Sequence, residues 1–265
     1  GDSYFNGENG MIAKELKSEY DEVLYFQNFC SYLQLRLFTD EGTPKSVKKI
    51  TLTANNPDDK IAGKGDIEYD GEEPVVYMYY EATNKITLDC GSGVELSQDA
   101  ENPTKFWFVL PGGFTFTEGF SVTVIFSDNS YFKQSTSKQI GIARNHIKPM
   151  APFKPEGVVP NGPIRYKYNS GSKEEPYPLK NTFYDENGSV LDIVDQVYDE
   201  ETGEWLVLLS GALKTIGGNS FNEPGPDIEY IKVDNNDESV KVDGFAFYNC
   251  TADDLIMLND VDEIN

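Results

Sequence analysis

Short runs of alternating hydrophobic and polar residues fill the first half of the chain. The hydrophobic positions of these runs are Leu33, Leu35 and Leu37; Ile50 and Leu52; Ile86 and Leu88; Phe106, Phe108 and Leu110; Phe120, Val122, Val124 and Phe126; and Ile140 and Ile142. A period of two is the pattern of a strand that buries one face. Residues 30–143 are therefore predicted to form a series of short, half-buried strands.

Turn-forming sequences separate these runs. They are Asn55-Asn56-Pro57-Asp58, Gly91-Ser92-Gly93, Pro111-Gly112-Gly113 and Asp128-Asn129-Ser130. Short strands at this spacing, with no helical period between them, predict an antiparallel β-sandwich. Residues 11–24 alone suggest a helix, through Ile12, Leu16 and Val23.

A change of composition follows the last of these strands. Five prolines occur between residues 148 and 163, at Pro149, Pro152, Pro155, Pro160 and Pro163. Such a density of proline disfavours both helices and central strands, and it is typical of a stiff, extended linker. We therefore expect a domain over residues 1–150, a linker over 151–163 and a second domain over 164–265.

The second domain is predicted to begin with strands and to end with a short repeat. Strand-like runs occupy residues 164–168, 190–197 and 205–209, and Glu201-Thr202-Gly203 is a predicted hairpin turn.

The repeat is marked by two pairs of apolar positions. Ile216 and Val242, like Phe221 and Phe247, are 26 positions apart, and another apolar run follows each phenylalanine. A period in the twenties with one short strand per unit is typical of a solenoid. Since two units cannot bury a continuous core, the preceding strands are expected to cap the stack.

The charge of the chain excludes one class of partner. The chain has 22 Lys and Arg against 45 Asp and Glu, a formal net charge of −23. Nucleic-acid binding depends on basic side chains that neutralise phosphates, so nucleic acid is not an expected partner. An anionic membrane surface is disfavoured for the same reason. No apolar run approaches the 18 or so residues of a membrane-spanning helix. The start of the sequence lacks a signal-peptide pattern, which leaves a cytosolic protein or an exported one with its signal removed.

Residues for catalysis or cofactor binding do not form recognisable motifs. The single histidine, His146, has no nucleophile elbow to pair with and is interpreted as a surface residue. The cysteines Cys30, Cys90 and Cys250 are not at zinc-ligand spacing. A Cys30–Cys90 disulfide stays open beside the interpretation of both as buried, small hydrophobic residues. We predict no enzyme, no metal site and no cofactor.

Two acidic features leave alternatives open. The many carboxylates could supply a glycosidase pair, although chance pairs are unavoidable at this acidity. Residues 234–238, Asp-Asn-Asn-Asp-Glu, offer oxygen ligands for calcium, but they lack the glycine and the distal glutamate of an EF-hand loop. A solvated loop is the simpler interpretation of that segment.

Three tyrosines are the candidate ligand-binding residues. Tyr77, Tyr79 and Tyr80 crowd one predicted strand together with Met78, so some of them must face outward. Exposed tyrosines can form a contact platform for a sugar or a protein. Packing against the linker or the second domain is the alternative.

Five segments of the first half together carry a family resemblance. They are Phe29–Leu33, Val47–Asn55, Ile61–Gly65, Phe108–Gly113, and Ser135-Thr136-Ser137 continuing into Ile142–Met150. In their order and spacing, residues 25–153 resemble the fimbrillin-like surface proteins of Bacteroidetes. The resemblance implies a transthyretin-like β-sandwich, exported as a lipoprotein and involved in adhesion or pilus-like assembly.

The second half carries another resemblance. Ile164–Tyr168, Gly211–Gly217 and Gly244–Thr251 resemble segments of BspA-type leucine-rich repeat surface proteins, and Ala246–Thr251 is the most specific match. The array is short, and Asn222–Pro226 replaces the usual cysteine-containing turn.

Together the two resemblances imply a lipid-anchored protein of the cell surface that binds host or cell-surface macromolecules without catalysis. The alternatives are a glycan-binding accessory of a polysaccharide-uptake system and a pilus-like subunit that assembles through its sheet edges.

Overall fold

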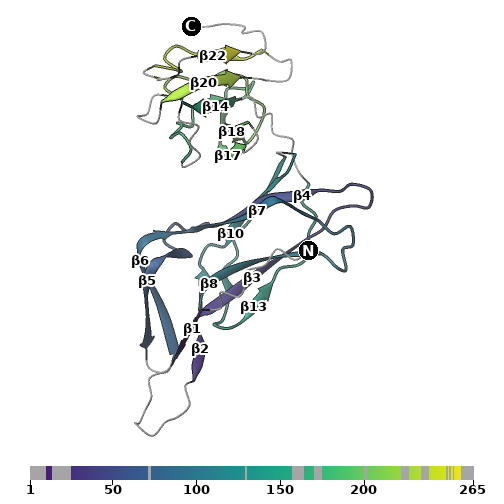
Figure 1. The fold of residues 1–265 in the computed structure, drawn as a ribbon, viewed down its shortest axis with the longest axis vertical. Coiled ribbons are helices and arrows are strands. Elements are labelled where there is room, and N and C mark those ends of the chain that lie inside the picture. The colour runs from purple at the N-terminus through teal and green to yellow at the C-terminus, as the bar shows by residue number, and fades with distance from the viewer. Residues whose placement is uncertain are drawn as a thin grey trace. The chain divides into compact units, whose positions relative to one another are not determined.

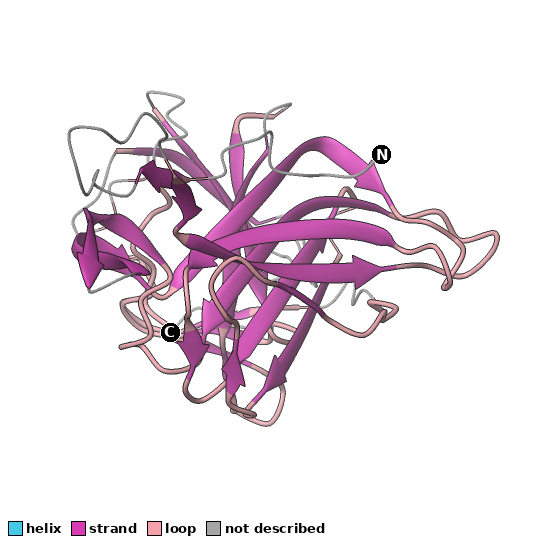
Figure 2. Cartoon of the chain, turned by 90° about the horizontal axis from the view of Figure 1, so that it is seen from below, coloured by secondary structure: helices cyan, strands magenta, loops and turns pink. Residues whose placement is uncertain are grey.

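β-strands and their connecting loops make up the described part of the chain in the computed structural model, and no helix occurs there (Figure 2). The described residues are 10–13, 25–70, 73–128, 130–156, 164–169, 175–199, 202–221, 227–233, 239–248, 250, 252 and 254–257. The chain divides into two compact units, Gly1–Val158 and Val159–Asn265. The dividing point falls within the predicted linker. The prediction of a mainly β protein is confirmed.

Two facing sheets form the body of the first unit, whose strands are shown in purple to teal in Figure 1. Its strands are β1 (Met11–Ala13), β2 (Phe26–Asn28), β3 (Cys30–Leu37), β4 (Ser46–Ala54), β5 (Ala62–Asp70), β6 (Glu73–Thr83), β7 (Lys85–Glu95), β8 (Thr104–Pro111), β9 (Thr115–Phe116), β10 (Phe120–Phe126), β11 (Tyr131–Thr136), β12 (Ile140–Gly141) and β13 (Ile147–Pro149). One sheet has the order β11-β10-β4-β7 and the other β13-β3-β8, while β1–β2, β5–β6 and β9–β12 are separate pairs.

The alternating residues of both sheets point into one core, which confirms the predicted β-sandwich. Leu33 and Phe108 from one sheet join Ile50 and Val124 from the other in a single buried cluster, each at most 1% exposed. Burial of one face of each sheet in this way is the main stabilising contribution in a sandwich.

Three details of the first unit differ from the sequence prediction. Residues Met11–Ala13, predicted to begin a helix, form β1, while residues 14–24 lie outside the described part. The predicted turn at Gly91-Ser92-Gly93 is a bulge inside β7, where the pairing with β4 shifts and Gly91 and Gly93 have positive φ. The predicted antiparallel sandwich has a parallel edge, since β13 runs alongside β3 in the same direction.

The proline-rich segment begins as an extension of that edge. The Met150 amide donates to the carbonyl of Gln34 at 2.9 Å, and the Phe153 amide donates to the carbonyl of Arg36 at 3.0 Å. The Phe153 ring lies 5.9 Å from the ring of Phe132, centroid to centroid. The first residues of the predicted linker therefore pack on the sandwich.

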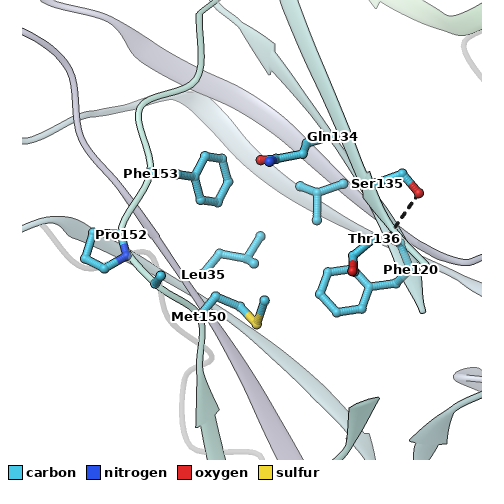
Figure 3. A pocket seen from close by; sticks show the side chains of 10 residues that line it. Leu35, Phe120, Gln134, Ser135, Thr136, Met150, Pro152 and Phe153 are labelled. Atoms are coloured by element: carbon cyan, nitrogen blue, oxygen red, sulfur yellow. Dashed lines mark hydrogen bonds between the residues drawn. The ribbon is translucent and has the colours of Figure 1, made fainter. Parts of the chain in front are cut away.

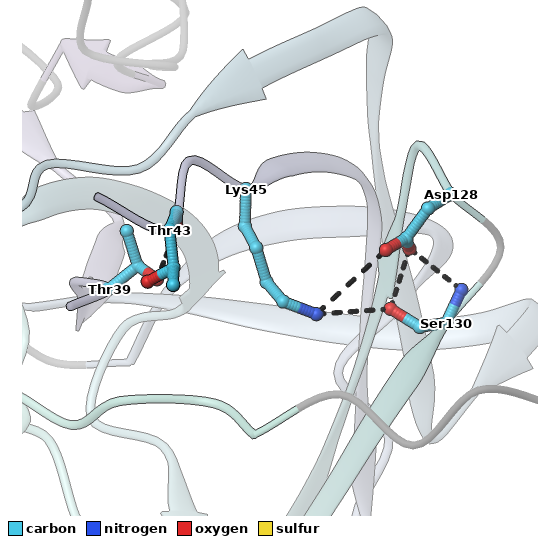
Figure 4. A network of polar contacts seen from close by, with 5 residues as sticks. All are labelled: Thr39, Thr43, Lys45, Asp128 and Ser130. Atoms are coloured by element: carbon cyan, nitrogen blue, oxygen red, sulfur yellow. Dashed lines mark hydrogen bonds and ion pairs between the residues drawn. The ribbon is translucent and has the colours of Figure 1, made fainter. Parts of the chain in front are cut away.

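A polar network joins Lys45, the residue before β4, to the turn between β10 and β11 (Figure 4). The Lys45 ammonium lies 3.3 Å from Ser130 Oγ and 3.9 Å from an Asp128 carboxylate oxygen. Ser130 donates to Asp128 through its hydroxyl at 2.6 Å and through its backbone amide at 2.9 Å. Partial burial acts to raise the pKa of Asp128, but the two bonds from Ser130 and the charge of Lys45 are among the contacts that together hold the pKa below its usual range.

The second unit is built from two sheets, which appear in green to yellow in Figure 1. Its strands are β14 (Ile164–Tyr168), β15 (Phe183–Tyr184), β16 (Val190–Leu191), β17 (Ile193–Asp199), β18 (Glu204–Leu209), β19 (Thr215–Ile216), β20 (Ile228–Val233), β21 (Lys241–Val242) and β22 (Asp254–Met257). The sheet orders are β17-β18-β14-β20-β22 and β16-β15-β19-β21.

The sequence repeat of the second unit forms a two-layer parallel stack. Ile216 pairs with Val242 across the parallel strands β19 and β21, with the 26-residue offset seen in the sequence. Strands β20 and β22 are also parallel, and Ile231 pairs with Leu255. The strands that precede the repeat close the stack on one side, because β14 and β15 join the same sheets in antiparallel orientation.

Aromatic rings fill the core of the second unit. Tyr166 is fully buried and stacks on Trp205 with 6.3 Å between ring centroids, while Phe221 and Tyr177 surround it. The buried Tyr166 hydroxyl donates to the side-chain carbonyl of Gln196 at 2.8 Å and accepts the Tyr177 amide at 2.7 Å. The buried hydroxyl of this tyrosine is thus satisfied both as a donor and as an acceptor, as burial requires.

Candidate binding surface on the β5–β6 ribbon

A two-stranded ribbon of β5 and β6 lies outside the two main sheets of the first unit (Figure 1). It contains the three tyrosines singled out from the sequence. Tyr77, Tyr79 and Tyr80 are 45%, 67% and 60% exposed, which makes them the largest group of exposed aromatic side chains on one described strand. All three face outward, whereas the sequence required this only of some.

The pairing of the two strands assigns their residues to faces. Directly paired residues of an antiparallel ribbon lie on the same face. Asp66 pairs with Tyr77 and Lys64 with Tyr80, and these four side chains therefore share one face. The opposite face carries more apolar, partly covered residues, with Ile67 paired to Val76 and Tyr69 to Pro74.

A β-bulge brings the third tyrosine to the same face. Strict alternation along β6 would place Tyr77 and Tyr79 on one face and Tyr80 on the other. The pairing shifts between Lys64 and Gly65, so that Tyr79 is an extra residue with no partner on β5. A bulge re-aims the side chains that follow it. As a result, Tyr80 returns to the face of Tyr77, and we call the surface formed by Tyr77, Tyr79 and Tyr80 the tyrosine face.

Glycine is required opposite this bulge. A Cβ atom on Gly65 would lie 1.7 Å from the carbonyl oxygen of Tyr77 and 3.0 Å from the Cα atom of Met78. No side chain fits at these distances, because the contact is with backbone that cannot rotate away. The glycines of Gly63-Lys64-Gly65 therefore allow the close approach of two strands.

Polar contacts order the rings of the tyrosine face. The Tyr79 hydroxyl donates to Asp66 Oδ2 at 2.6 Å, and this bond to a carboxylate raises the pKa of the phenol. The Lys64 ammonium lies 5.5 Å from the centroid of the Tyr80 ring and 2.6 Å from Glu81 Oε2. An ammonium over a tyrosine ring is a cation–π contact.

Two contacts fasten the ribbon to the rest of the first unit. The Tyr69 hydroxyl donates to the carbonyl oxygen of Ile12 on β1 at 3.2 Å. The Arg144 guanidinium donates to Glu73 Oε1 at 3.1 Å and to the carbonyl oxygen of Asn28 at 3.0 Å. Tyr69 lies on the opposite face, and Glu73 lies at the start of β6, four residues before Tyr77, so neither contact involves the three tyrosines.

Exposed tyrosines with neighbouring carboxylates suit binding rather than covalent chemistry. A tyrosine offers a large, rigid apolar surface and a hydroxyl at low conformational cost, which is why tyrosine is enriched among residues that dominate interfaces. The role of these three residues in ligand binding stays a prediction.

A second candidate is a hollow of about 220 Å³ at the edge of the sandwich (Figure 3). It opens between the β10–β11 hairpin and the segment that follows β13. Its lining is mainly apolar, with Leu35, Phe120 and Met150 on one side and Phe153 beside the polar Gln134. This hollow could not be predicted from the sequence, because it depends on where residues 150–153 return to the sheet.

The histidine and the cysteines singled out from the sequence form no common site. His146 is exposed, as predicted, and its Nδ1 lies 2.9 Å from the carbonyl oxygen of Arg144. Cys30, Cys90 and Cys250 are thiols, so the Cys30–Cys90 bridge does not form, and burial raises the pKa of Cys30. Within the described residues no group of three metal-ligating side chains occurs. The calcium candidate at 234–238 lies outside the described residues.

Comparisons with known proteins give one distant likeness. No family model matches the chain, and no curated protein matches it. A solved structure described as a "putative cell adhesion protein" from Bacteroides ovatus ATCC 8483 aligns with 51% of this chain at 16% identity and a TM-score of 0.33. The aligned part spans less than half of that protein, 44% of its chain. Among the described residues, no helix has the length and apolar character needed to cross a membrane.

Proposed function

We propose that this chain is a non-catalytic adhesion or recognition protein of a bacterial cell surface. The observation that carries the proposal is the tyrosine face, where a bulge gathers three rings that are 45–67% exposed on one side of a ribbon outside the hydrophobic core. Exposing three large aromatic side chains together has no benefit for folding, and such clusters mark interaction sites.

The proposal includes the nature of the two units. The first would be a fimbrillin-like sandwich, and the second a short BspA-type leucine-rich repeat module. Supporting the latter, the repeat stacks in parallel with the 26-residue offset. The protein would be exported and lipid-anchored, so that both units face the medium. A strongly acidic surface, with a net charge of −23, suits a protein that must stay soluble there.

Two other functions are favoured by particular observations. The same exposed rings could stack on sugars, as in a glycan-binding accessory of a polysaccharide-uptake system. Among the described strands, β11 and β13 are edge strands of the two main sheets and could accept a strand from another copy, as in a pilus-like subunit.

The test is a binding screen of the full chain against matrix proteins and a glycan array, with the variant Tyr77→Ser/Tyr79→Ser/Tyr80→Ser in parallel. Tyr248→Ser is the matched control, since Tyr248 is 53% exposed and belongs to the other unit. Binding to a protein target that the triple variant loses and the control keeps supports the proposal. Binding confined to one polysaccharide favours the uptake function. No binding by any form, or polymers that grow with concentration, would favour a structural subunit.

A further inference from the structure

The tyrosine face is acidic as well as aromatic. Asp66 and Glu68 lie on the β5 side of this face, since they pair with Tyr77 and Val75, and Glu81 follows Tyr80 on β6. Lys64 is the one basic residue among the paired positions of this face, and its charge is already matched by Glu81. The face therefore presents aromatic rings in a negative field, on a chain whose net charge is −23.

One positively charged side chain of the ribbon, that of Lys64, already contacts this face. The Lys64 ammonium is held between the Tyr80 ring, at 5.5 Å, and the Glu81 carboxylate, at 2.6 Å. The ring quadrupole and the carboxylate act together on this group, even though its side chain is 68% exposed. This contact is an example of a cation placed between a tyrosine ring and a carboxylate.

A second position with tyrosine rings and carboxylates lies on the same face. Tyr77 and Tyr79 lie beside Asp66, which accepts the Tyr79 hydroxyl, and beside Glu68. Within the described residues, neither Asp66 nor Glu68 forms an ion pair. The hydrogen bond to Asp66 fixes the Tyr79 ring before any ligand arrives, which lowers the entropic cost of binding.

We propose that the tyrosine face binds a basic, arginine-containing peptide segment of a partner protein. A guanidinium is the group that best uses this surface, because it can stack on a tyrosine ring and donate a forked pair of hydrogen bonds to a carboxylate at once. Polyanionic partners are repelled by the same carboxylates. The inference rests on the proposed adhesive function and specifies the chemistry of the ligand.

The probe is an arginine–serine repeat peptide, titrated into the full chain by calorimetry at low and at physiological salt. A citrulline–serine peptide of equal length is the matched control, since citrulline keeps the shape of arginine without its charge. Nonspecific attraction of a basic peptide to an acidic protein is separated by the variant Tyr77→Ser/Tyr79→Ser/Tyr80→Ser, which keeps the net charge. Asp66→Asn/Glu68→Gln tests the carboxylates, and Tyr248→Ser in the second unit is the aromatic control.

The expected result is binding of the arginine peptide that weakens with salt, is absent for the citrulline peptide and is unchanged in Tyr248→Ser. Removing the three rings should weaken it at least about tenfold, given the size of cation–π contacts at exposed sites. Circular dichroism of each variant should match that of the parent, because these side chains are outside the core.

Equal affinity in the tyrosine variant would overturn the inference, since binding would then be general charge attraction. Tyrosine-dependent binding of a neutral polysaccharide without binding of the peptide would also overturn it. In that case, a target from the matrix or glycan screen would still lose affinity in the triple variant. The proposed binding function would then stand, and only the ligand class would be wrong.

Discussion

The substitution Gly65→Ala tests whether the bulge creates the tyrosine face. A methyl group on Gly65 would lie 1.7 Å from the Tyr77 carbonyl oxygen, and a non-bonded carbon needs at least 3.0 Å there. The strands must therefore separate by more than 1 Å. A backbone hydrogen bond stretched that far is lost, because these bonds weaken beyond about 3.2 Å.

The magnitude follows from the bonds affected. Each ladder bond contributes about 0.5–1.5 kcal/mol net. Losing the two that flank the substituted position should lower the local stability of the ribbon by about 1–3 kcal/mol. The sandwich should be little affected, because its core draws on β3, β4, β8 and β10, and no described residue of β5 or β6 belongs to that buried cluster.

Hydrogen exchange of backbone amides measures this directly. Amides of β5 and β6 should exchange about 10-fold to 100-fold faster in Gly65→Ala, whereas amides of β4 and β10 keep their protection. Gly141→Ala is the matched control, because its Cβ would meet only the Thr115 hydroxyl at an ordinary 3.4 Å. Unchanged exchange in β5 and β6 would refute the argument that the close approach of these strands requires glycine.

Three further substitutions test the cores and the buried charge. Phe221→Ala should lower the free energy of unfolding of the second unit by about 3–5 kcal/mol, since this ring is fully buried. Urea unfolding followed by Trp205 fluorescence in a Trp107→Phe background measures the loss. A loss below about 1 kcal/mol would contradict the assignment of Phe221 to the core. Gly119→Ala should lower the free energy of unfolding of the first unit by about 2 kcal/mol or more. The Gly119 backbone is left-handed, with φ 74°, and an added Cβ would lie 1.9 Å from a backbone oxygen. Urea unfolding followed by Trp107 fluorescence measures the loss, and an unchanged unfolding midpoint would contradict it. Glu204→Gln should lower the free energy of unfolding of the second unit by about 1.5–3 kcal/mol at neutral pH, and the loss should be smaller in acid. An equal loss of stability at pH 7 and at pH 3 would contradict this prediction.

The pH dependence of Glu204 follows from its partners. The Glu204 side chain is 8% exposed, and it accepts hydrogen bonds from Tyr230 at 2.7 Å and from Arg165 at 3.2 Å. Burial alone would raise the pKa of Glu204, but these partners outweigh burial and lower the pKa below the ordinary 4.5. A lowered pKa gives stability that is present above the unfolded-state value and is lost as the pH falls through the folded-state value. The same contact, with burial as the larger cause, raises the pKa of Tyr230 to about 12.

Periodic features of the fold could be predicted from the sequence. The strand β14 occupies the predicted residues 164–168, because its side chains alternate in burial as they alternate in the sequence. The parallel register of Ile216 with Val242 follows from the repeat, since equivalent side chains must occupy equivalent places in neighbouring layers.

Features that break a period could not be predicted in the same way. The bulge at Tyr79 and the bulge in β7 each shift the register between paired strands. Local residue propensities do not specify where such a shift occurs. A signal was nevertheless present. Gly63 and Gly65 flank a lysine in a strand-like run, and isolated glycines inside strands mark bulges or close approaches.

The bulge places the three tyrosines where substitutions need not affect the core of the first unit. The tyrosine face belongs to a ribbon whose three rings contribute nothing to the buried cluster of the sandwich. Substitutions at Tyr77, Tyr79 and Tyr80 are therefore expected to alter binding without lowering stability, whereas Gly65 must be kept for the face to exist. A surface of this kind can acquire a new specificity through its exposed side chains while its backbone stays fixed. Such a separation of recognition from folding would suit the adhesive function proposed above.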